Sequence, residues 1–271
     1  MNDTLIFLHL PRTGGTTLRD ILSNQYPENE TFENKTLLDT DRNFNDNNIN
    51  EMSQYKLIKG HVYFGIHNYI SKPCKYFAMM RDPVERTISA YNYIKKRNNH
   101  PFHVLANELE LKDFVESGKN IMVNNGQTRL IAGRETSLNV PFDDIDESHL
   151  ELAKINIDDH FILIGFTERY DETVLLMKHL MNWDTPYYSI ANAVKRERKT
   201  DEMDPSTIDI IKHYNQLDID LYDFAKKKFD DTWKNFPAVQ EELDRFKLQN
   251  KISGKFRIGE RLKRKFKKWI T

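Results

Sequence analysis

The stretch TLIFLHLPRTGGTT, residues 4–17, is followed at residues 18–22 by three apolar side chains with helical spacing. Its first half is short, apolar and ended by Pro11, which is typical of a buried strand. Its second half holds the adjacent Gly14 and Gly15, which let the backbone turn tightly and bring its N–H groups close to an anion. A strand that runs through a glycine turn into a helix predicts an α/β fold with an anion-binding loop at the strand's end.

The turn at residues 11–17 carries further features of a phosphate-binding loop. Arg12 contributes a permanent positive charge, and its donors match the geometry of phosphate oxygens. Thr16 is placed to cap the following helix, whose N-terminus itself attracts anions. The turn is not a Walker A loop, because no Gly-Lys-Ser/Thr closes it and its cation precedes the glycines. A plain strand-to-helix turn with a capping threonine is the alternative interpretation.

Four short apolar stretches are predicted to form the sheet, with amphipathic stretches of helical spacing between and after them. The predicted strands are Leu5–Leu10, Lys56–Gly60, Tyr76–Met80 and Phe161–Gly165. Strands that alternate with helices predict an α/β fold with a doubly wound, mostly parallel sheet, followed by a helical C-terminal third. Residues 27–53 are rich in Asn, Asp, Glu and Thr and are interpreted as a surface excursion. Ligands of such sheets bind beyond the carboxyl ends of the strands.

A second motif, RDPVERTISAY at residues 81–91, follows the third predicted strand. Asp82 is a good N-cap residue, and Glu85 three positions later completes the pattern of a capping box. Arg81 therefore lies at a strand end, with Ser89 about two turns along the next helix. A guanidinium and a hydroxyl that converge there predict a second phosphate site. The alternative is that Arg81 pairs with a carboxylate while Ser89 only packs.

The composition is that of an ordinary globular protein, with 39% hydrophobic and 30% charged residues in a chain of 271. No run of about 18 apolar residues occurs, so no transmembrane helix is expected, and the N-terminus lacks the pattern of a signal peptide. The single Cys74 excludes an internal disulfide and a cysteine-cluster metal site, and no His-Glu-x-x-His pattern is present. These features predict a cytoplasmic protein without a metal.

The last 18 residues, 254–271, differ from the rest of the chain. They hold eight Lys and Arg against one Glu, a net charge of +7, while the whole chain has a net charge of −1. Apolar residues recur among them with helical spacing, which predicts a basic amphipathic tail attached to a domain at residues 1–253. Such a tail suits an anionic surface, and we expect peripheral binding at the inner face of a membrane. Binding of an anionic glycan, or packing on the domain itself, are the alternatives.

The two motifs together resemble the sulfotransferases that use 3′-phosphoadenosine-5′-phosphosulfate (PAPS). The likeness is to the branch with the heparan sulfate 2-O- and 6-O-sulfotransferases and bacterial carbohydrate sulfotransferases. It covers roughly residues 4–230, including GFTERY at 165–170 and NQLD at 215–218. The resemblance implies transfer of a sulfuryl group from PAPS to a hydroxyl of a carbohydrate, with 3′-phosphoadenosine-5′-phosphate (PAP) as the other product.

The resemblance also implies the residues of the donor site. The 5′-phosphosulfate would be surrounded by Arg12, Thr13, Gly14, Gly15, Thr16 and Thr17. The 3′-phosphate would be held by Arg81 and Ser89, with Lys199 and Thr200 closing over the nucleotide. Position 12 departs from the family pattern, which has lysine there. An arginine can neutralise charge on the leaving phosphate but does not give up a proton.

His61 is the predicted catalytic base. It ends the second predicted strand, in KGHVYFG at 59–65, and so lies on the same sheet edge as both anion loops. The segment resembles the one that carries the catalytic histidine of 2-O-sulfotransferases, and an imidazole titrates near neutrality. A strand-end histidine bonded to the backbone is the alternative. His9 is expected to lie inside the first strand and to pack.

The polar segment NNGQTR, residues 124–129, resembles the acceptor side of this branch. Gln127 and Arg129 are therefore predicted to contact the acceptor, and a capped helix start is the alternative. Two other functions remain open: a phosphotransferase related to P-loop kinases, and a nucleotide-binding scaffold without catalysis. No nucleic-acid partner is expected, and the sequence does not indicate the oligomeric state or the acceptor hydroxyl.

Overall fold

The computed structural model describes residues 3–188 and 203–252 of the chain. Five strands form one sheet, in the spatial order β2-β3-β1-β4-β5, and every neighbouring pair is parallel. The strands are β1 Thr4–Leu8, β2 Thr31–Asn34, β3 Leu57–Gly60, β4 Cys74–Met80 and β5 Phe161–Phe166. The predicted α/β fold with a parallel sheet is confirmed. Since all the strands run the same way, their carboxyl ends meet at one edge.

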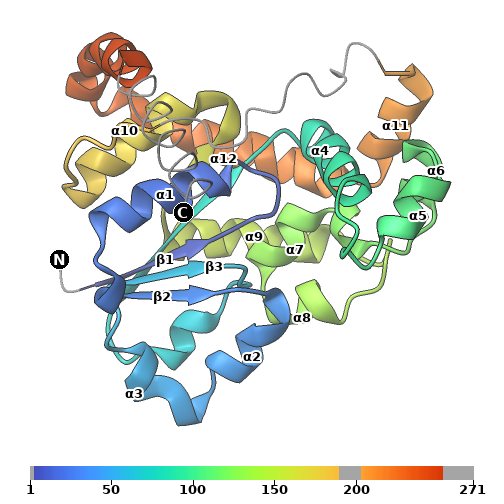
Figure 1. The fold of residues 1–271 in the computed structure, drawn as a ribbon, viewed down its shortest axis with the longest axis horizontal. Coiled ribbons are helices and arrows are strands. Elements are labelled where there is room, and N and C mark those ends of the chain that lie inside the picture. Colours follow the sequence, from blue (N-terminus) through green and yellow to red (C-terminus); the bar gives the residue numbers. More distant parts are fainter. Residues whose placement is uncertain (1–2, 189–202, 253–271) are drawn as a thin grey trace, which may run out of the picture.

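Helices make up most of the remaining described chain (Figure 1). Those before β5 are α1 Gly15–Gln25, α2 Thr40–Asn43, α3 Ile49–Met52, α4 Pro83–Lys95, α5 His103–Glu108, α6 Leu111–Glu116, α7 Gly126–Ala132, α8 Arg134–Leu138 and α9 Glu147–His160. Those after it are α10 Tyr170–Met181, α11 Pro205–His213 and α12 Gln216–Lys234, followed by a helical stretch at 237–252. The predicted helical C-terminal third is confirmed, since α11, α12 and the stretch at 237–252 make up most of its described residues.

The helices cover both faces of the sheet. On one face, Lys59 of β3 donates to the hydroxyl of Ser23 in α1 (2.7 Å), and Gly165 of β5 lies against Thr173 of α10. On the opposite face α9 packs against β4 and β5, with α7 beside it (Figure 1). The sheet is therefore doubly wound, and its central strands β1, β3 and β4 are almost fully buried because both faces are covered.

Residues 27–53 contain more structure than the sequence analysis expected. The segment TFEN forms the edge strand β2 and pairs with β3, and the short helices α2 and α3 follow it. This strand has only four residues and exposes Glu33, so it lacks the apolar run by which the other strands were recognised. Its pairing with β3 brings Asn34 next to Gly60, at the edge where the site lies.

A second apolar cluster lies to the side of the sheet, under α4, α5, α6 and α11, which lie together at the right of Figure 1. Its members include Ile88 and Tyr91 of α4. Among residues 3–188 and 203–252, no helix is long and apolar enough to cross a membrane. The predicted tail at 254–271 lies outside the described residues, and the boundary at residue 253 stays a prediction.

Candidate active site

The exit of β1 forms a tight turn that leaves the start of α1 open. Arg12 and Gly14 both have a positive φ, 72° and 79°, and the Thr13 hydroxyl donates to the Leu10 carbonyl (2.8 Å). Gly14, and not Thr16, is the N-cap residue, and no side chain caps this helix. The prediction of a capping threonine is therefore wrong: Thr16 lies inside the first turn. Gly14 has no side chain with which to cap α1, and the N-terminus of a helix attracts anions.

Gly15 is required by its closeness to His9. A Cβ atom at position 15 would lie 1.9 Å from His9 Nε2, a distance at which the histidine ring would have to move. His9 follows β1, which ends at Leu8, so its expected place inside the strand is corrected. The ring packs against the glycine turn and fixes how close the loop comes to it.

The exit of β4 is built differently. Asp82 caps α4, since its Oδ1 accepts a hydrogen bond from the Glu85 N–H (2.9 Å). The predicted capping box is only half formed, because the Glu85 carboxylate pairs with Arg81 (3.1 Å) instead of reaching back to the backbone of Asp82. That backbone N–H donates to Glu168 Oε1 (3.0 Å). Ser89 is buried two turns along the helix.

The two motifs meet at one place. Arg12 Nη2 lies 2.9 Å and Arg12 Nε 3.2 Å from the Ser89 hydroxyl, although 77 residues separate them in sequence. The guanidinium also lies over the ring of Tyr93, 4.6 Å from its centroid. A cation of the first loop is therefore seated on the helix of the second motif. This is the arrangement that one ligand with two anionic groups would bridge.

The segment after β5 joins both loops. The Thr167 hydroxyl donates to the Met80 carbonyl at the end of β4 (3.2 Å). The ring of Tyr170 covers Gly14, whose Cβ, if it had one, would lie 3.2 Å from that ring. Three neighbouring strands thus contribute their exits to one site, as expected at the carboxyl edge of a doubly wound sheet.

His61 lies at the same edge, stacked on His9 with ring centroids 4.5 Å apart and planes 18° apart. Its backbone is fixed by Asn34, which accepts from the His61 N–H (3.1 Å) and donates through its side chain to the His61 carbonyl (2.7 Å). Gly60 permits this close approach, because a Cβ there would lie 2.0 Å from the Asn34 carbonyl oxygen. The contacts form a chain from His61 through His9 to Gly15.

Burial keeps both rings neutral. Desolvation lowers the pKa of His9 to about 3, and the neighbouring His61 and arginines act in the same direction. Desolvation also lowers the pKa of His61 below its ordinary value of 6.5, against a smaller opposite effect of a hydrogen bond to the His9 backbone. A neutral imidazole is the form that can accept a proton.

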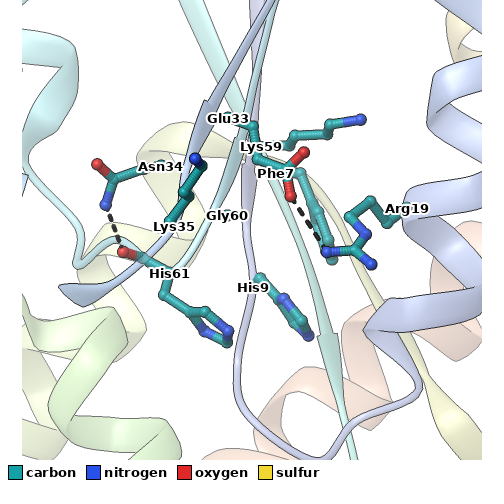
Figure 2. Close-up of a pocket in the computed structure, with 9 residues that line it drawn as sticks. All are labelled: Phe7, His9, Arg19, Glu33, Asn34, Lys35, Lys59, Gly60 and His61. Atoms are coloured by element: carbon teal, nitrogen blue, oxygen red, sulfur yellow. Dashed lines mark hydrogen bonds and ion pairs between the residues drawn. The ribbon is translucent and has the colours of Figure 1, made fainter. Parts of the chain in front are cut away.

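The histidines open onto a pocket between α1 and the β2 edge of the sheet (Figure 2). It is lined by Phe7, His9, Arg19, Glu33, Asn34, Lys35, Lys59, Gly60 and His61. Arg19 pairs with Glu33 (3.2 Å), and burial lowers the pKa of Lys59. The sequence analysis missed these charged residues. Lys59 lies in β3 and His61 directly follows it, and their spacing of two residues was the available signal that they share a face.

A sequence model of the sulfotransferase family matches residues 1–225. The chain belongs to the sulfotransferase family. Among solved structures it is similar to the mouse sulfotransferase SULT7A1 complexed with PAP, with a TM-score of 0.41 and 14% identity over 79% of this chain and 64% of the mouse chain. It is also similar to a sulfotransferase from Alicyclobacillus acidocaldarius, with a TM-score of 0.43 and 15% identity over 81% and 93% of the two chains.

This chain therefore spans less than two thirds of the length of the mouse protein. No curated protein matches the sequence. Membership of the sulfotransferase family thus rests on the family match over most of the chain, and the fold described above agrees with it.

The two residues of this sulfotransferase that were predicted to contact the acceptor form hydrogen bonds within the protein. Arg129 is fully buried, and its guanidinium donates to the carbonyls of Asn124, Thr136, Val140 and Pro141 and to the Asn124 side chain. The prediction that Arg129 contacts the acceptor is therefore corrected: its donors bind the loops around α7. Gln127 is also fully buried and bonds to the backbone of Arg81, and its predicted contact with the acceptor stays a prediction.

Two further residues predicted to bind the PAPS donor lie at the start of α1. Thr17 is buried in the first turn of α1, and Thr16 is half-buried beside it. Lys199 and Thr200 lie outside the described residues, so their predicted contact with the nucleotide stays a prediction. Within the described ranges, no three His, Cys, Asp or Glu side chains are grouped as metal ligands.

Proposed function

We propose that this member of the sulfotransferase family transfers a sulfuryl group from PAPS to a hydroxyl of a carbohydrate, with His61 as the general base. The observation that carries the proposal is the contact of Arg12 with Ser89, next to the uncapped start of α1. It puts two anion-binding features at one strand edge, and PAPS carries anionic groups at both its 5′ and 3′ ends.

The residues present fit this donor. The N-terminus of α1, with glycines at its N-cap and at its first helical position, suits the 5′-phosphosulfate. Arg81 and Ser89 suit the 3′-phosphate, because a guanidinium binds phosphate oxygens with two donors at once. Arg81 is engaged by Glu85 in the described structure, and we expect the phosphate to compete with this half-exposed carboxylate.

The roles in the transfer follow from charge and protonation. The acceptor oxygen forms a bond to sulfur as the bond between sulfur and the bridging oxygen breaks, and the acceptor proton goes to His61. Arg12 stabilises the negative charge that develops on the bridging oxygen and the 5′-phosphate. It acts as a cation and not as an acid, since a guanidinium keeps its proton.

A carbohydrate acceptor is supported by the lining of the pocket in front of His61. Arg19, Glu33, Asn34 and Lys35 supply charged or amide groups, and Phe7 is the aromatic residue among the nine that line it. Hydrogen-bonding groups of this kind suit a polyhydroxylated ring better than an apolar phenol or steroid. The predicted cytoplasmic location and the binding of the tail to an anionic membrane stay predictions.

The test is a calorimetric titration of the full chain with PAP, with ADP as the control nucleotide that lacks the 3′-phosphate. We expect PAP to bind more tightly, and Arg81→Ala to weaken PAP binding about 10- to 100-fold with little effect on ADP, because charge-assisted hydrogen bonds are lost. Transfer of labelled sulfate from PAPS to glycans and to phenols then identifies the acceptor class. Equal affinity for PAP and ADP would refute the proposal and favour a phosphotransferase.

A further inference from the structure

The backbone of Arg81 is held on both sides by the side chain of Gln127. The Gln127 Oε1 accepts from the Arg81 N–H (3.0 Å), and its Nε2 donates to the Arg81 carbonyl (3.0 Å). Gln127 belongs to α7, 46 residues away in sequence, and is fully buried. Because Arg81 follows the last residue of β4, this amide bracket replaces the support that a neighbouring strand would give.

Gln127 is held in turn by a buried carboxylate of α12. Asp218 accepts from the backbone N–H groups of Gln127 (3.1 Å) and Thr128 (2.7 Å) and from the Thr128 hydroxyl (2.8 Å). These are the first N–H groups of α7, whose own N-cap residue makes no side-chain cap bond. Asp218, although distant in sequence, therefore caps this helix and fixes the position of the Gln127 backbone.

The same carboxylate reaches the helix that carries Ser89. Asp218 lies 3.5 Å from the guanidinium of Arg86, one turn before Ser89 on α4, and Arg86 also donates to the Met122 carbonyl (2.8 Å). Both charged side chains are almost fully buried, and Arg86 Nε is a buried donor that has no hydrogen-bond partner in the described structure. Asp218 thus connects the two parts of the predicted 3′-phosphate site, the Arg81 backbone and α4.

Stability alone gives a poor reason for this network. A buried ion pair is often matched or exceeded in stability by apolar residues of similar volume, and an unsatisfied donor adds a further cost. What the network does supply is a fixed position for two segments that are distant in sequence.

We propose that Gln127 and Asp218 are positioning residues that set the selectivity for the donor's 3′-phosphate, by holding Arg81 and the Ser89 helix in register. This inference rests on the proposed function, because it assigns the 3′-phosphate to Arg81 and Ser89. Neither residue touches the nucleotide in this arrangement. Their effect on binding passes through Arg81.

The test compares Gln127→Leu with a matched control, Asn156→Leu. Asn156 is also a buried amide that supports α7, since it donates to the Ile131 and Ala132 carbonyls at the other end of the helix (2.9 and 3.3 Å). We expect Gln127→Leu to weaken PAP binding roughly tenfold, as when one charge-assisted hydrogen bond is misplaced, and to leave ADP binding unchanged. The control is expected to keep the wild-type ratio of the two affinities.

A double-mutant cycle with Arg81→Ala separates positioning from general support. If Gln127 acts through Arg81, the double variant binds PAP no more weakly than Arg81→Ala alone. The inference would be overturned if Gln127→Leu weakened PAP and ADP binding equally. It would also be overturned if the fold-changes in PAP affinity of the two single variants multiplied in the double variant. Should Gln127→Leu fail to fold by circular dichroism, Gln127→Glu replaces it, because the carboxylate still accepts from the Arg81 N–H but no longer donates to the carbonyl.

These experiments distinguish a failure of the proposed function from a failure of the positioning role. A wild-type chain that does not prefer PAP over ADP refutes the proposed function itself. A wild-type preference that Arg81→Ala removes and Gln127→Leu leaves intact refutes only the positioning role.

Discussion

The starts of α1 and α4 make an instructive comparison, because both helices follow parallel strands of one sheet and both are predicted to face the same donor. α1 begins at a glycine with a φ of 79° and has no side-chain cap. α4 begins at Asp82, whose carboxylate accepts the N–H of Glu85. The cap residue of the first helix makes no side-chain bond to the helix, whereas the cap residue of the second accepts the N–H of Glu85.

This difference explains the residue types at the two sites. An uncapped helix can bind an anion through its backbone, so the first motif needs glycines and tolerates little side-chain volume near His9. In α4 the Asp82 carboxylate already occupies the position at the helix N-terminus where an anion would bind. The second motif must therefore bind through side chains, which is the part assigned to Arg81 and Ser89, and these have to be held from outside by α7 and α12.

The sharpest way to break the comparison is to give α1 the kind of cap that α4 has. Gly14 is exposed, and a Cβ there would lie 3.2 Å from the Tyr170 ring and 3.8 Å from Thr167 Cγ2. We expect Gly14→Asp to weaken PAP binding about 10- to 100-fold relative to Gly14→Asn, because the carboxylate would occupy the helix N-terminus and repel the 5′-phosphate. Calorimetric titration at low salt measures the effect.

Gly14→Asn is the matched control for this change. Asparagine has the same size as aspartate and tolerates a positive φ, so the backbone strain is similar and only the charge differs. Equal affinities of the two variants for PAP would contradict the assignment of the 5′ group to α1.

The α1 side of the comparison also carries the stacked histidines, and this predicts a pH dependence. His61 must be neutral to accept a proton, and burial lowers its pKa, so kcat/KM is expected to begin its fall at a lower pH than it would with an ordinary imidazole. Below the lowered pKa it should fall by about tenfold per pH unit as the ring becomes protonated. The measurement is a pH profile of sulfate transfer for the wild type and for His61→Asn.

His61→Asn should lose most of the transfer at every pH, along with the acid limb of the profile. An unchanged acid limb in a variant that still transfers sulfate would show that another group titrates. Binding of PAP should not change, because His61 is assigned to the acceptor side.

The sequence was sufficient to predict the parts of the fold that local patterns encode. β1, β3, β4 and β5 were recognised to within two residues at each end, because buried parallel strands are continuous apolar runs. β2 was missed, since a four-residue edge strand with an exposed Glu33 has no such run. Thr16 was misassigned as a cap because a glycine in the left-handed conformation took that place.

The parts of the site that the sequence did not predict depend on distant contacts. The stacking of His9 on His61 joins the ends of two strands about 50 residues apart, and nothing near either residue indicates it. Arg129 in a polar segment resembles a ligand-binding residue until the loop carbonyls that it binds are known. Asp218 belongs to the NQLD segment of the resemblance, but its role could not be predicted because its partners belong to α4 and α7.

The smallest effect concerns the cap of α4. Asp82→Ala removes the hydrogen bond to the Glu85 N–H and is expected to lower the free energy of unfolding by about 1 kcal/mol. Asp82→Asn keeps a capping oxygen and should cost much less, while it removes a negative charge beside Arg81. If the capped helix truly binds through its side chains, neither variant gains PAP affinity from the newly uncharged or uncapped N-terminus by more than about twofold. Thermal unfolding and PAP titration measure the two quantities. A large gain in PAP affinity for Asp82→Ala would mean that the N–H groups of α4 bind the phosphate once the Asp82 carboxylate is removed. The N-termini of α1 and α4 would then differ only in whether a carboxylate already occupies the anion position.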